Sequence, residues 1–214
     1  MKPKLLDLFA GAGGCSMGYH RAGFEVVGVD INFQKNYPFE FHQADAMHFP
    51  LDGFDVIHAS PPCQKYSVIC KGMNTTEGRP DLIDWMRLRL IQSGKHYVIE
   101  NVVGAPLDSP VMLCGSMFSL GTAGGLWLRR HRLFESSFPL PQLECSHPGG
   151  VSIGVYGNGT NKWHRDKLGR CVSVDEQREA MGIDWMPRSS LSQSIPPAYT
   201  KWIGRQIMEQ LNSY

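Results

Sequence analysis

A cysteine, a carboxylate beside an amide, a glycine-rich turn and a pair of arginines are the residues of this chain whose types and spacing could support catalysis. Cys63 follows Pro61 and Pro62, which Ser60 separates from the apolar run 54–59. A thiolate is a strong nucleophile, and two consecutive prolines fix the backbone so that the next side chain points in one direction. Residues 60–64 therefore predict a nucleophilic cysteine, although a structural cysteine in a turn explains the same residues.

Glu100 and Asn101 stand near the end of another apolar run, residues 97–102. Ligands bind at the carboxyl ends of strands in an open α/β sheet, so an acid and an amide at this point favour a role in binding or proton transfer. Burial of a carboxylate without a partner costs free energy and usually raises its pKa. An exposed glutamate in a loop is the alternative.

The glycine-rich turn covers residues 10–18 and follows the apolar run 5–9. Small residues let the backbone approach a ligand, and a helix over residues 15–22 would direct its first amides at that ligand. Asp30 ends the apolar run 25–30, 17 residues after Gly13, near the spacing at which a carboxylate meets ribose hydroxyls. Asp45 could accept from an adenine amino group or cap a helix. No second dinucleotide-binding half follows, so we expect one adenosyl nucleoside rather than NAD.

The elements that must position these residues are apolar strands alternating with helical segments. We expect strands at residues 5–9, 25–30, 54–59 and 97–102, and helices at 15–22, 81–93 and 199–211. Leu82, Trp85, Met86 and Leu90 are expected on one face of the middle helix. This alternation is typical of an α/β fold with a doubly wound, mostly parallel sheet.

Composition places the chain among ordinary globular proteins. Its 214 residues, 42% hydrophobic and 19% charged, suit one domain with a sizeable core. No apolar run approaches the length of a membrane span and the N-terminus leads straight into a strand, so we expect a cytoplasmic protein with no membrane partner. The six cysteines form no CxxC pair, which indicates reduced thiols.

Positive charge gathers in the middle of the chain, where residues 120–170 hold seven Lys or Arg against three Asp or Glu. Binding a polyanion needs local positive charge, so this stretch predicts a phosphate-facing surface, and a plain solvated face is the alternative. The basic residues concerned are Arg129, Arg130, Arg132, Lys162, Arg165, Lys167 and Arg170.

Taken in order, the motifs resemble those of the cytosine carbon-5 DNA methyltransferases that use S-adenosylmethionine. The matching motifs are Phe9-Ala10-Gly11-Ala12-Gly13-Gly14, Pro61-Pro62-Cys63-Gln64, Glu100-Asn101-Val102 and Arg130-His131-Arg132. The resemblance covers roughly residues 4–134 and 170–207. It implies the Rossmann-like methyltransferase fold, with a catalytic domain of residues 1–135 and 170–214 and a small basic target-recognition subdomain of residues 136–169.

The resemblance also implies a mechanism. A thiolate of Cys63 adds to carbon 6 of cytosine, and Glu100 contacts ring nitrogen 3 and the exocyclic amine and favours protonation there. Arg130 and Arg132 help to hold the base and the thiolate. The sequence does not identify the base that removes the carbon-5 proton, and water is a candidate. A duplex substrate requires the cytosine to be flipped out of the stack.

By the same resemblance we assign binding residues. Those for S-adenosylmethionine are Phe9, Ala10, Gly11, Gly13, Gly14, Asp30, Ile31, Asp45, Ala46, Pro62, Gln193 and Ile195. Those for the substrate are Gln64, Ser67, Asn101, Lys162 and Arg165. The expected partner is double-stranded DNA, and we expect a monomer.

Several positions depart from the family pattern. Leu128 stands where the family usually has glutamine, and Gln193 replaces an asparagine near the cofactor, which predicts altered geometry rather than lost function. Glu179 replaces an arginine, and Arg178 is displaced by one position. Only residues 133–169 separate Arg132 from Arg170, so sequence readout must be minimal.

The short recognition region leaves the substrate open. The same chemistry on RNA or a free cytosine nucleotide is one alternative, and an inactive protein that binds nucleic acid is another. Cys145, His147, His164 and Cys171 are residue types that bind zinc, but their spacing matches no standard site. We therefore expect no metal and interpret them as loop or packing residues.

Overall fold

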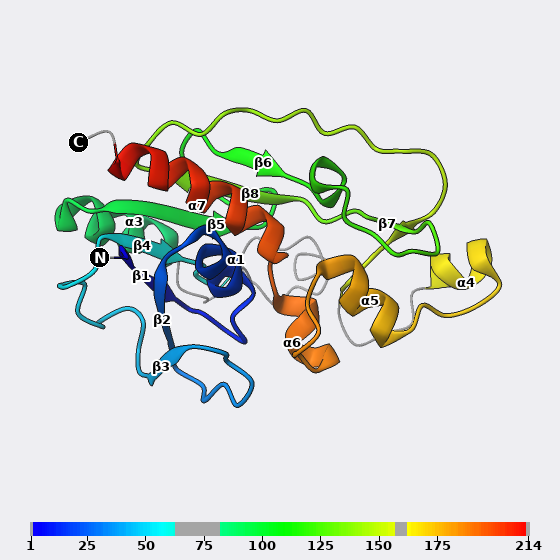
Figure 1. Cartoon of the computed structure of the whole chain (residues 1–214), viewed down its shortest axis with the longest axis horizontal. Coiled ribbons are helices and arrows are strands. Elements are labelled where there is room, and N and C mark those ends of the chain that lie inside the picture. The colour runs from blue at the N-terminus through cyan, green and yellow to red at the C-terminus, as the bar shows by residue number, and fades with distance from the viewer. Residues whose placement is uncertain (1, 63–81, 157–161, 213–214) are drawn as a thin grey trace.

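The computed structural model describes residues 2–62, 82–156 and 162–212, and its centre is one seven-stranded sheet (Figure 1). The strand order is β3-β2-β1-β4-β5-β8-β6. These strands are β1 (Lys4–Leu8), β2 (Glu25–Asp30), β3 (Glu40–Gln43), β4 (Val56–Ala59), β5 (His96–Asn101), β6 (Val111–Leu113) and β8 (Arg132–Ser136). The first five are parallel, and β8 runs antiparallel to both β5 and β6. The predicted strands are therefore confirmed.

Strand β1 pairs with β2 on one side and with β4 on the other. Leu5 is in register with both Val26 and Val56. The chain therefore winds outward in one direction through β2 and β3 and in the other through β4 and β5. Beyond the carboxyl ends of the strands at such a reversal lies a crevice, which is the usual ligand site in open α/β sheets.

Helices cover both faces of the sheet, as predicted for a doubly wound fold (Figure 1). Leu5 faces the core beneath α1 (Gly14–Ala22) and α7 (Pro197–Leu211), where it clusters with Tyr199 and Ile203. Leu6 points to the opposite face, because side chains alternate along a strand, and joins the core beneath α3 (Leu82–Ser93). None of the helices in the described ranges is long and apolar enough to cross a membrane.

Close packing of α1 on α7 fixes the carboxyl-terminal segment against the glycine-rich turn. A Cβ on Gly18 would overlap Oγ1 of Thr200, and a Cβ on Gly14 would overlap the carbonyl oxygen of Ile195. The Thr200 hydroxyl donates to the Cys15 carbonyl at 2.8 Å. Glycine at these two positions therefore lets α7 and the residues before it approach the start of α1.

A second, smaller layer is built on the parallel pair β7 (Trp127–Leu128) and β9 (Ser152–Ile153). Its core also takes in α5 (Val174–Met181) and α6 (Arg188–Gln193), and it includes Ala12 of the glycine-rich turn. The remaining elements are the short helix η2 (Gly115–Phe118) and α4 (Lys162–Leu168). Within the predicted subdomain 136–169, Phe138 packs in the core beneath α7 and Ile153 in this smaller core.

One local expectation, on α3, and one alternative, a helix cap at Asp45, were wrong. The buried residues of α3 are Ile83, Met86 and Leu90, whereas Trp85 is 41% exposed. The spacing 83, 86 and 90 defines the buried stripe, which leaves position 85 outside it. Residues 44–55, between β3 and β4, contain no helix, so Asp45 caps none: it lies in a turn, where its Oδ1 accepts from the backbone amide of Met47 at 2.9 Å.

Candidate functional site

A cavity of about 650 Å³ lies at the carboxyl ends of the central parallel strands. Its wall combines the glycine-rich turn, the residues that follow β2 and β4, the end of β5 and the segment 189–195. The volume falls in the range of small-molecule sites, which is about 300–1,000 Å³. The site therefore forms where the strand order reverses.

Nearly all the residues assigned to the cofactor line this cavity. Those that line it are Phe9, Ala10, Gly11, Gly14, Asp30, Ile31, Asp45, Ala46, Pro62, Gln193 and Ile195. Gly13 is the exception. It precedes α1 with a φ of 86° and packs against Tyr37 and Pro38, so the backbone conformation of the turn explains why glycine stands at this position.

The Asp30 carboxylate joins the glycine-rich turn to the end of β2. Its Oδ2 accepts from the Gly11 amide at 3.0 Å and its Oδ1 accepts from the Asn32 amide at 2.9 Å. A carboxylate has about four acceptor positions, so both oxygens keep capacity for a ligand. The two backbone bonds hold the side chain at the cavity wall.

Asp7 is a cavity residue that sequence reasoning missed. Its carboxyl accepts from both the hydroxyl and the backbone N–H of Ser16, in the first turn of α1. The other oxygen, Oδ1, is buried and has no hydrogen-bond partner among the described residues. Burial raises the pKa of Asp7 to about 7. An acid inside the otherwise apolar run 5–9 was the signal that could have revealed it.

Glu100 and Arg132 meet at the cavity wall from neighbouring strands. Arg132 Nε lies 3.2 Å from Glu100 Oε1, and the two side chains are 13% and 9% exposed. Burial raises the pKa of Glu100, although Arg132 and a hydrogen bond from Ser60 act in the opposite direction. This carboxyl therefore holds a proton to higher pH than an exposed glutamate does.

A buried hydrogen-bonded chain leads from α1 to Glu100. The Tyr19 hydroxyl lies 2.9 Å from His58 Nδ1, and His58 Nε2 lies 2.9 Å from the Ser60 hydroxyl. Burial lowers the pKa of His58 to about 3, so the ring is neutral. With its proton on Nε2, His58 accepts from Tyr19 and donates to Ser60, whose own proton goes to Glu100. Sequence reasoning missed His58, a polar residue inside an apolar run.

Asn101 was assigned to the substrate, but in the structure its amide is used within the protein. Its Nδ2 donates to the Pro61 carbonyl at 3.0 Å, and its Oδ1 accepts from the Val102 amide at 2.9 Å. The side chain is buried. Asn101 thus fixes the backbone just before Pro62, which lines the cavity.

The prediction that Arg130 faces phosphates was wrong, because its side chain is fully buried. Its guanidinium donates to the carbonyls of Val155 at 2.6 Å and Ser192 at 2.9 Å, and burial lowers its pKa to about 9. It is not among the described residues that line the cavity. Arg130 instead ties the segment before β8 to the segment after β9 and to α6.

The other basic residues differ in exposure and in whether an acidic residue pairs with them. Arg129 and Arg165 are exposed, which suits contact with a large anion. Arg170 is paired with Glu176 at 2.7 Å, so that its charge is partly neutralised. Fewer basic side chains are therefore available for a phosphate-facing surface than the sequence predicted.

Several assigned residues lie outside the described part of the chain. These are Cys63, Gln64 and Ser67, and the side chain of Lys162. Pro62 is the last described residue before Cys63, and it lines the cavity.

The departures from the family pattern have local explanations. Leu128 is fully buried in the smaller core. Glu179 Oε1 accepts from the Ala123 amide at 2.7 Å, and Arg178 donates to the Met186 carbonyl through Nε at 3.0 Å. Gln193 lines the cavity at the end of α6.

Comparison with known proteins places this geometry in context. Residues 3–106 match the family described as C-5 cytosine-specific DNA methylase. The type II methyltransferase M.HgiGI of Herpetosiphon aurantiacus is 31% identical over 120 residues, which cover 49% of this chain and 94% of that protein. M.FnuDI of Fusobacterium nucleatum is 31% identical over 113 residues, covering 47% of this chain but 33% of that protein. The chain thus spans about a third of the length of some curated relatives.

Solved structures share the fold over nearly the whole chain. The Entamoeba histolytica methyltransferase EhMeth superimposes with a TM-score of 0.63 at 14% identity, covering 99% of each chain. The S. pombe Dnmt2 methyltransferase gives 0.62 at 12% identity, covering 99% of this chain and 100% of that one. At this level of identity the likeness establishes the fold alone.

Proposed function

The chain belongs to the C-5 cytosine-specific DNA methylase family, and from that premise we propose that it transfers a methyl group from S-adenosylmethionine to carbon 5 of cytosine in DNA. The observation that carries this proposal is one cavity shared by three groups. The glycine-rich turn with Asp30, the paired Glu100, and Pro62, which directly precedes Cys63 in the sequence, all line it.

The residues present fit an adenosyl cofactor that carries an ammonium group. Asp7 Oδ1 is buried at the cavity wall without a partner among the described residues, so an ammonium proton would satisfy it. Asp30 would accept from the ribose hydroxyls, and Asp45 from the adenine amine. When bound, S-adenosylmethionine supplies an electrophilic methyl group.

Cys63 and Glu100 divide the activation of cytosine between them. The thiolate of Cys63 forms a bond to carbon 6 as nitrogen 3 takes up a proton, so that carbon 5 becomes nucleophilic. Glu100 is suited to hold that proton, since burial raises its pKa. Once carbon 5 carries the methyl group, loss of the carbon-5 proton, departure of Cys63 and return of the nitrogen-3 proton to Glu100 restore the aromatic ring. Arg132 keeps the Glu100 carboxyl in position.

DNA is the substrate we favour, with the cytosine extruded from the duplex because a stacked base cannot reach a buried carboxyl. The exposed Arg129 and Arg165 are suited to phosphate contacts, which position the duplex without reading its sequence. The small number of residues between Arg132 and Arg170 supports a short or relaxed target sequence.

The experiment is transfer of labelled methyl groups to duplex DNA, single-stranded DNA, transfer RNA and dCMP side by side. We expect incorporation into duplex DNA by wild type and none by Cys63→Ala. Cys171→Ser is the matched control, since Cys171 is exposed and does not line the cavity. Incorporation only into RNA or dCMP would show that this molecule, and not DNA, is the substrate. Undiminished transfer by Cys63→Ala would overturn the mechanism. No transfer to any substrate, together with no binding of S-adenosylmethionine in calorimetry, would indicate an inactive binding protein.

A further inference from the structure

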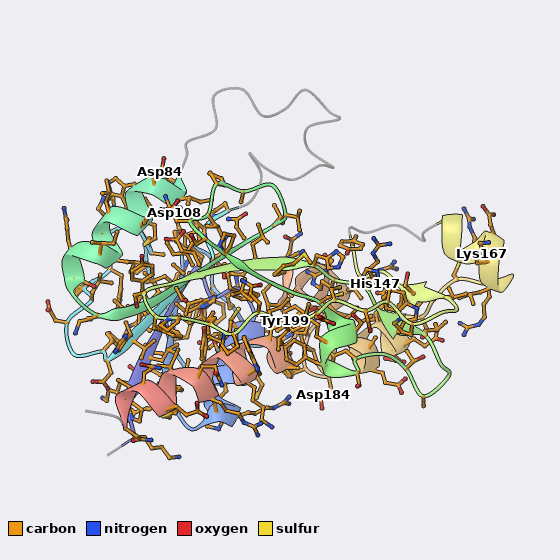
Figure 2. The ribbon with its side chains drawn as sticks, turned by 90° about the horizontal axis from the view of Figure 1, so that it is seen from above. Asp84, Asp108, His147, Lys167, Asp184 and Tyr199 are labelled. Atoms are coloured by element: carbon orange, nitrogen blue, oxygen red, sulfur yellow. The ribbon has the colours of Figure 1, made fainter. Side chains whose placement is uncertain are left out.

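Four side chains of types that bind metals converge beside the smaller sheet, and none of them lines the cavity. They are Cys114 just after β6, His131 between β7 and β8, and Cys145 and His147 in the link between β8 and β9. One atom from each lies within 4.8 Å of the other three. Figure 2 shows His147 between Tyr199 in the main body and Lys167 on α4.

The spacing of these atoms is close to that of the ligand atoms in a tetrahedral zinc site. Zinc bonds of about 2.3 Å to sulfur and about 2.0–2.1 Å to nitrogen place pairs of tetrahedral ligand atoms about 3.3–3.8 Å apart. Here His131 Nε2 is 3.2 Å from His147 Nε2 and 3.4 Å from Cys145 Sγ. His147 Nε2 is 3.1 Å from Cys145 Sγ and 3.7 Å from Cys114 Sγ.

Hydrogen bonding alone does not account for this cluster. His147 Nε2 faces one nitrogen and two sulfur atoms at these distances. An imidazole nitrogen carries either one proton or one lone pair, so it can serve only one of the three. A cation at the centre of the four atoms would be bonded to all of them at once.

We propose that Cys114, His131, Cys145 and His147 bind one structural zinc ion. Two sulfur and two nitrogen ligands suit zinc, and four protein ligands leave no open position for catalysis. Two thiolates and two neutral imidazoles balance the charge of the ion. The Trp127 ring stacks on His147 with centroids 4.9 Å apart and shields one side of the site.

The ion would connect parts of the chain that are far apart in sequence. Cys145 and His147 belong to residues 139–151, which contain no helix or strand. The other two proposed ligands of the ion, Cys114 and His131, lie next to strands β6 and β8 of the large sheet. His131 stands between Arg130 and Arg132, so the metal would also fix the backbone that presents Arg132 to Glu100. This proposal does not depend on the methyl-transfer reaction.

Metal analysis of the purified full chain tests the site. The protein is produced in zinc-supplemented medium, kept reduced and never exposed to a chelator. We expect about one zinc ion per chain, and loss of most of it in Cys145→Ser and in His147→Ala. The matched controls Cys171→Ser and His42→Ala remove an exposed cysteine and a partly exposed histidine outside the cluster and should keep the ion.

A second measurement keeps the test independent of variant folding. Cobalt added to chelator-treated wild type should give the visible absorption of a tetrahedral site with thiolate ligands, and zinc should abolish it. Wild type that carries little zinc and shows no such absorption overturns the proposal. So does a disulfide between Cys114 and Cys145, seen as two thiols that react only after reduction. Equal zinc in wild type and in both cluster variants would also contradict it.

Discussion

Arg132 and Glu100 form an ion pair between β8 and β5, with Nε and Oε1 3.2 Å apart. The pair lies where the antiparallel strand β8 meets the parallel part of the sheet. Burial raises the pKa of Glu100 and the arginine opposes this rise. Arg132 therefore fixes the position of the carboxyl without removing its tendency to hold a proton.

Arg132→Ala should destabilise the protein, because it leaves Glu100 buried without its charged partner. Breaking a buried pair in this way costs about 3–5 kcal/mol, reduced here to the extent that Glu100 takes up a proton. Urea unfolding at pH 7 measures the loss. Arg129→Ala, at an exposed position, should stay within about 0.5 kcal/mol of wild type. Equal stability of the two variants would contradict a structural role for the pair.

Glu100→Gln should lower methyl transfer by about 10²- to 10⁴-fold, the usual contribution of a general acid or base. Glutamine keeps the size of the side chain and removes its titratable proton. Calorimetry should give an unchanged affinity for S-adenosylmethionine, since Asp30 and the glycine-rich turn remain intact. A variant with normal turnover would show that Glu100 does not handle the proton.

Ser60→Ala should move the pH profile of methyl transfer to higher pH. The Ser60 hydroxyl bonds to Glu100 and lowers the pKa of that carboxyl, so its removal lets the pKa of Glu100 rise further. The limb of the rate profile that depends on Glu100 should then shift upward. Rates measured from pH 5 to pH 9 test this, and a profile that only falls in height would argue for simple misfolding.

Asp7→Asn should change how stability depends on pH. Burial raises the pKa of native Asp7 from 3.8 to about 7, so the native state keeps a proton that the unfolded chain releases between these values. Wild type therefore loses stability as pH rises through that window, by no more than about 4 kcal/mol from this group. Asparagine does not titrate, so the stability of the variant relative to wild type should rise between about pH 4 and pH 7 and stay level above that. Parallel melting curves would contradict the assignment.

Asp30→Asn should weaken binding of S-adenosylmethionine, because a charged acceptor for the ribose is replaced by a neutral amide. Hydrogen bonds to charged groups contribute about 1.5–3 kcal/mol, which corresponds to roughly 10- to 150-fold in affinity. Titration calorimetry measures it. Glu40→Gln, on the neighbouring strand β3 and outside the cavity, is the control and should bind normally.

The central strands could be predicted because buried parallel strands appear as apolar runs, as residues 5–9, 25–30, 54–59 and 97–102 show. The glycine-rich turn and Asp30 could be placed at one edge because carboxyl ends of parallel strands meet there. The antiparallel strand β8 and its place between β5 and β6 could not be predicted in this way. Its anchor is the buried Glu135 on β8, which pairs with Arg87 of α3 at 2.8 Å, a contact between residues far apart in sequence.

The site residues that sequence reasoning missed also depend on contacts between residues far apart in the sequence. Asp7 and His58 interrupt apolar runs, and only the fold brings Ser16 and Tyr19 to them. Cys145 and His147 are residue types that bind zinc, but their spacing matches no standard site, and Cys114 and His131 reach them only through the folding of three separate segments. Spacing along the chain carries little information about such contacts.

The most direct measurement is covalent trapping on DNA of complex sequence in which 5-fluorocytosine replaces cytosine. Fluorine at carbon 5 cannot leave as a proton does, so the enzyme stays bonded to carbon 6 after methyl transfer. We predict a denaturation-resistant adduct that forms with wild type, requires S-adenosylmethionine and is absent with Cys63→Ala. No adduct with wild type, or an adduct that Cys63→Ala still forms, would contradict the proposed reaction.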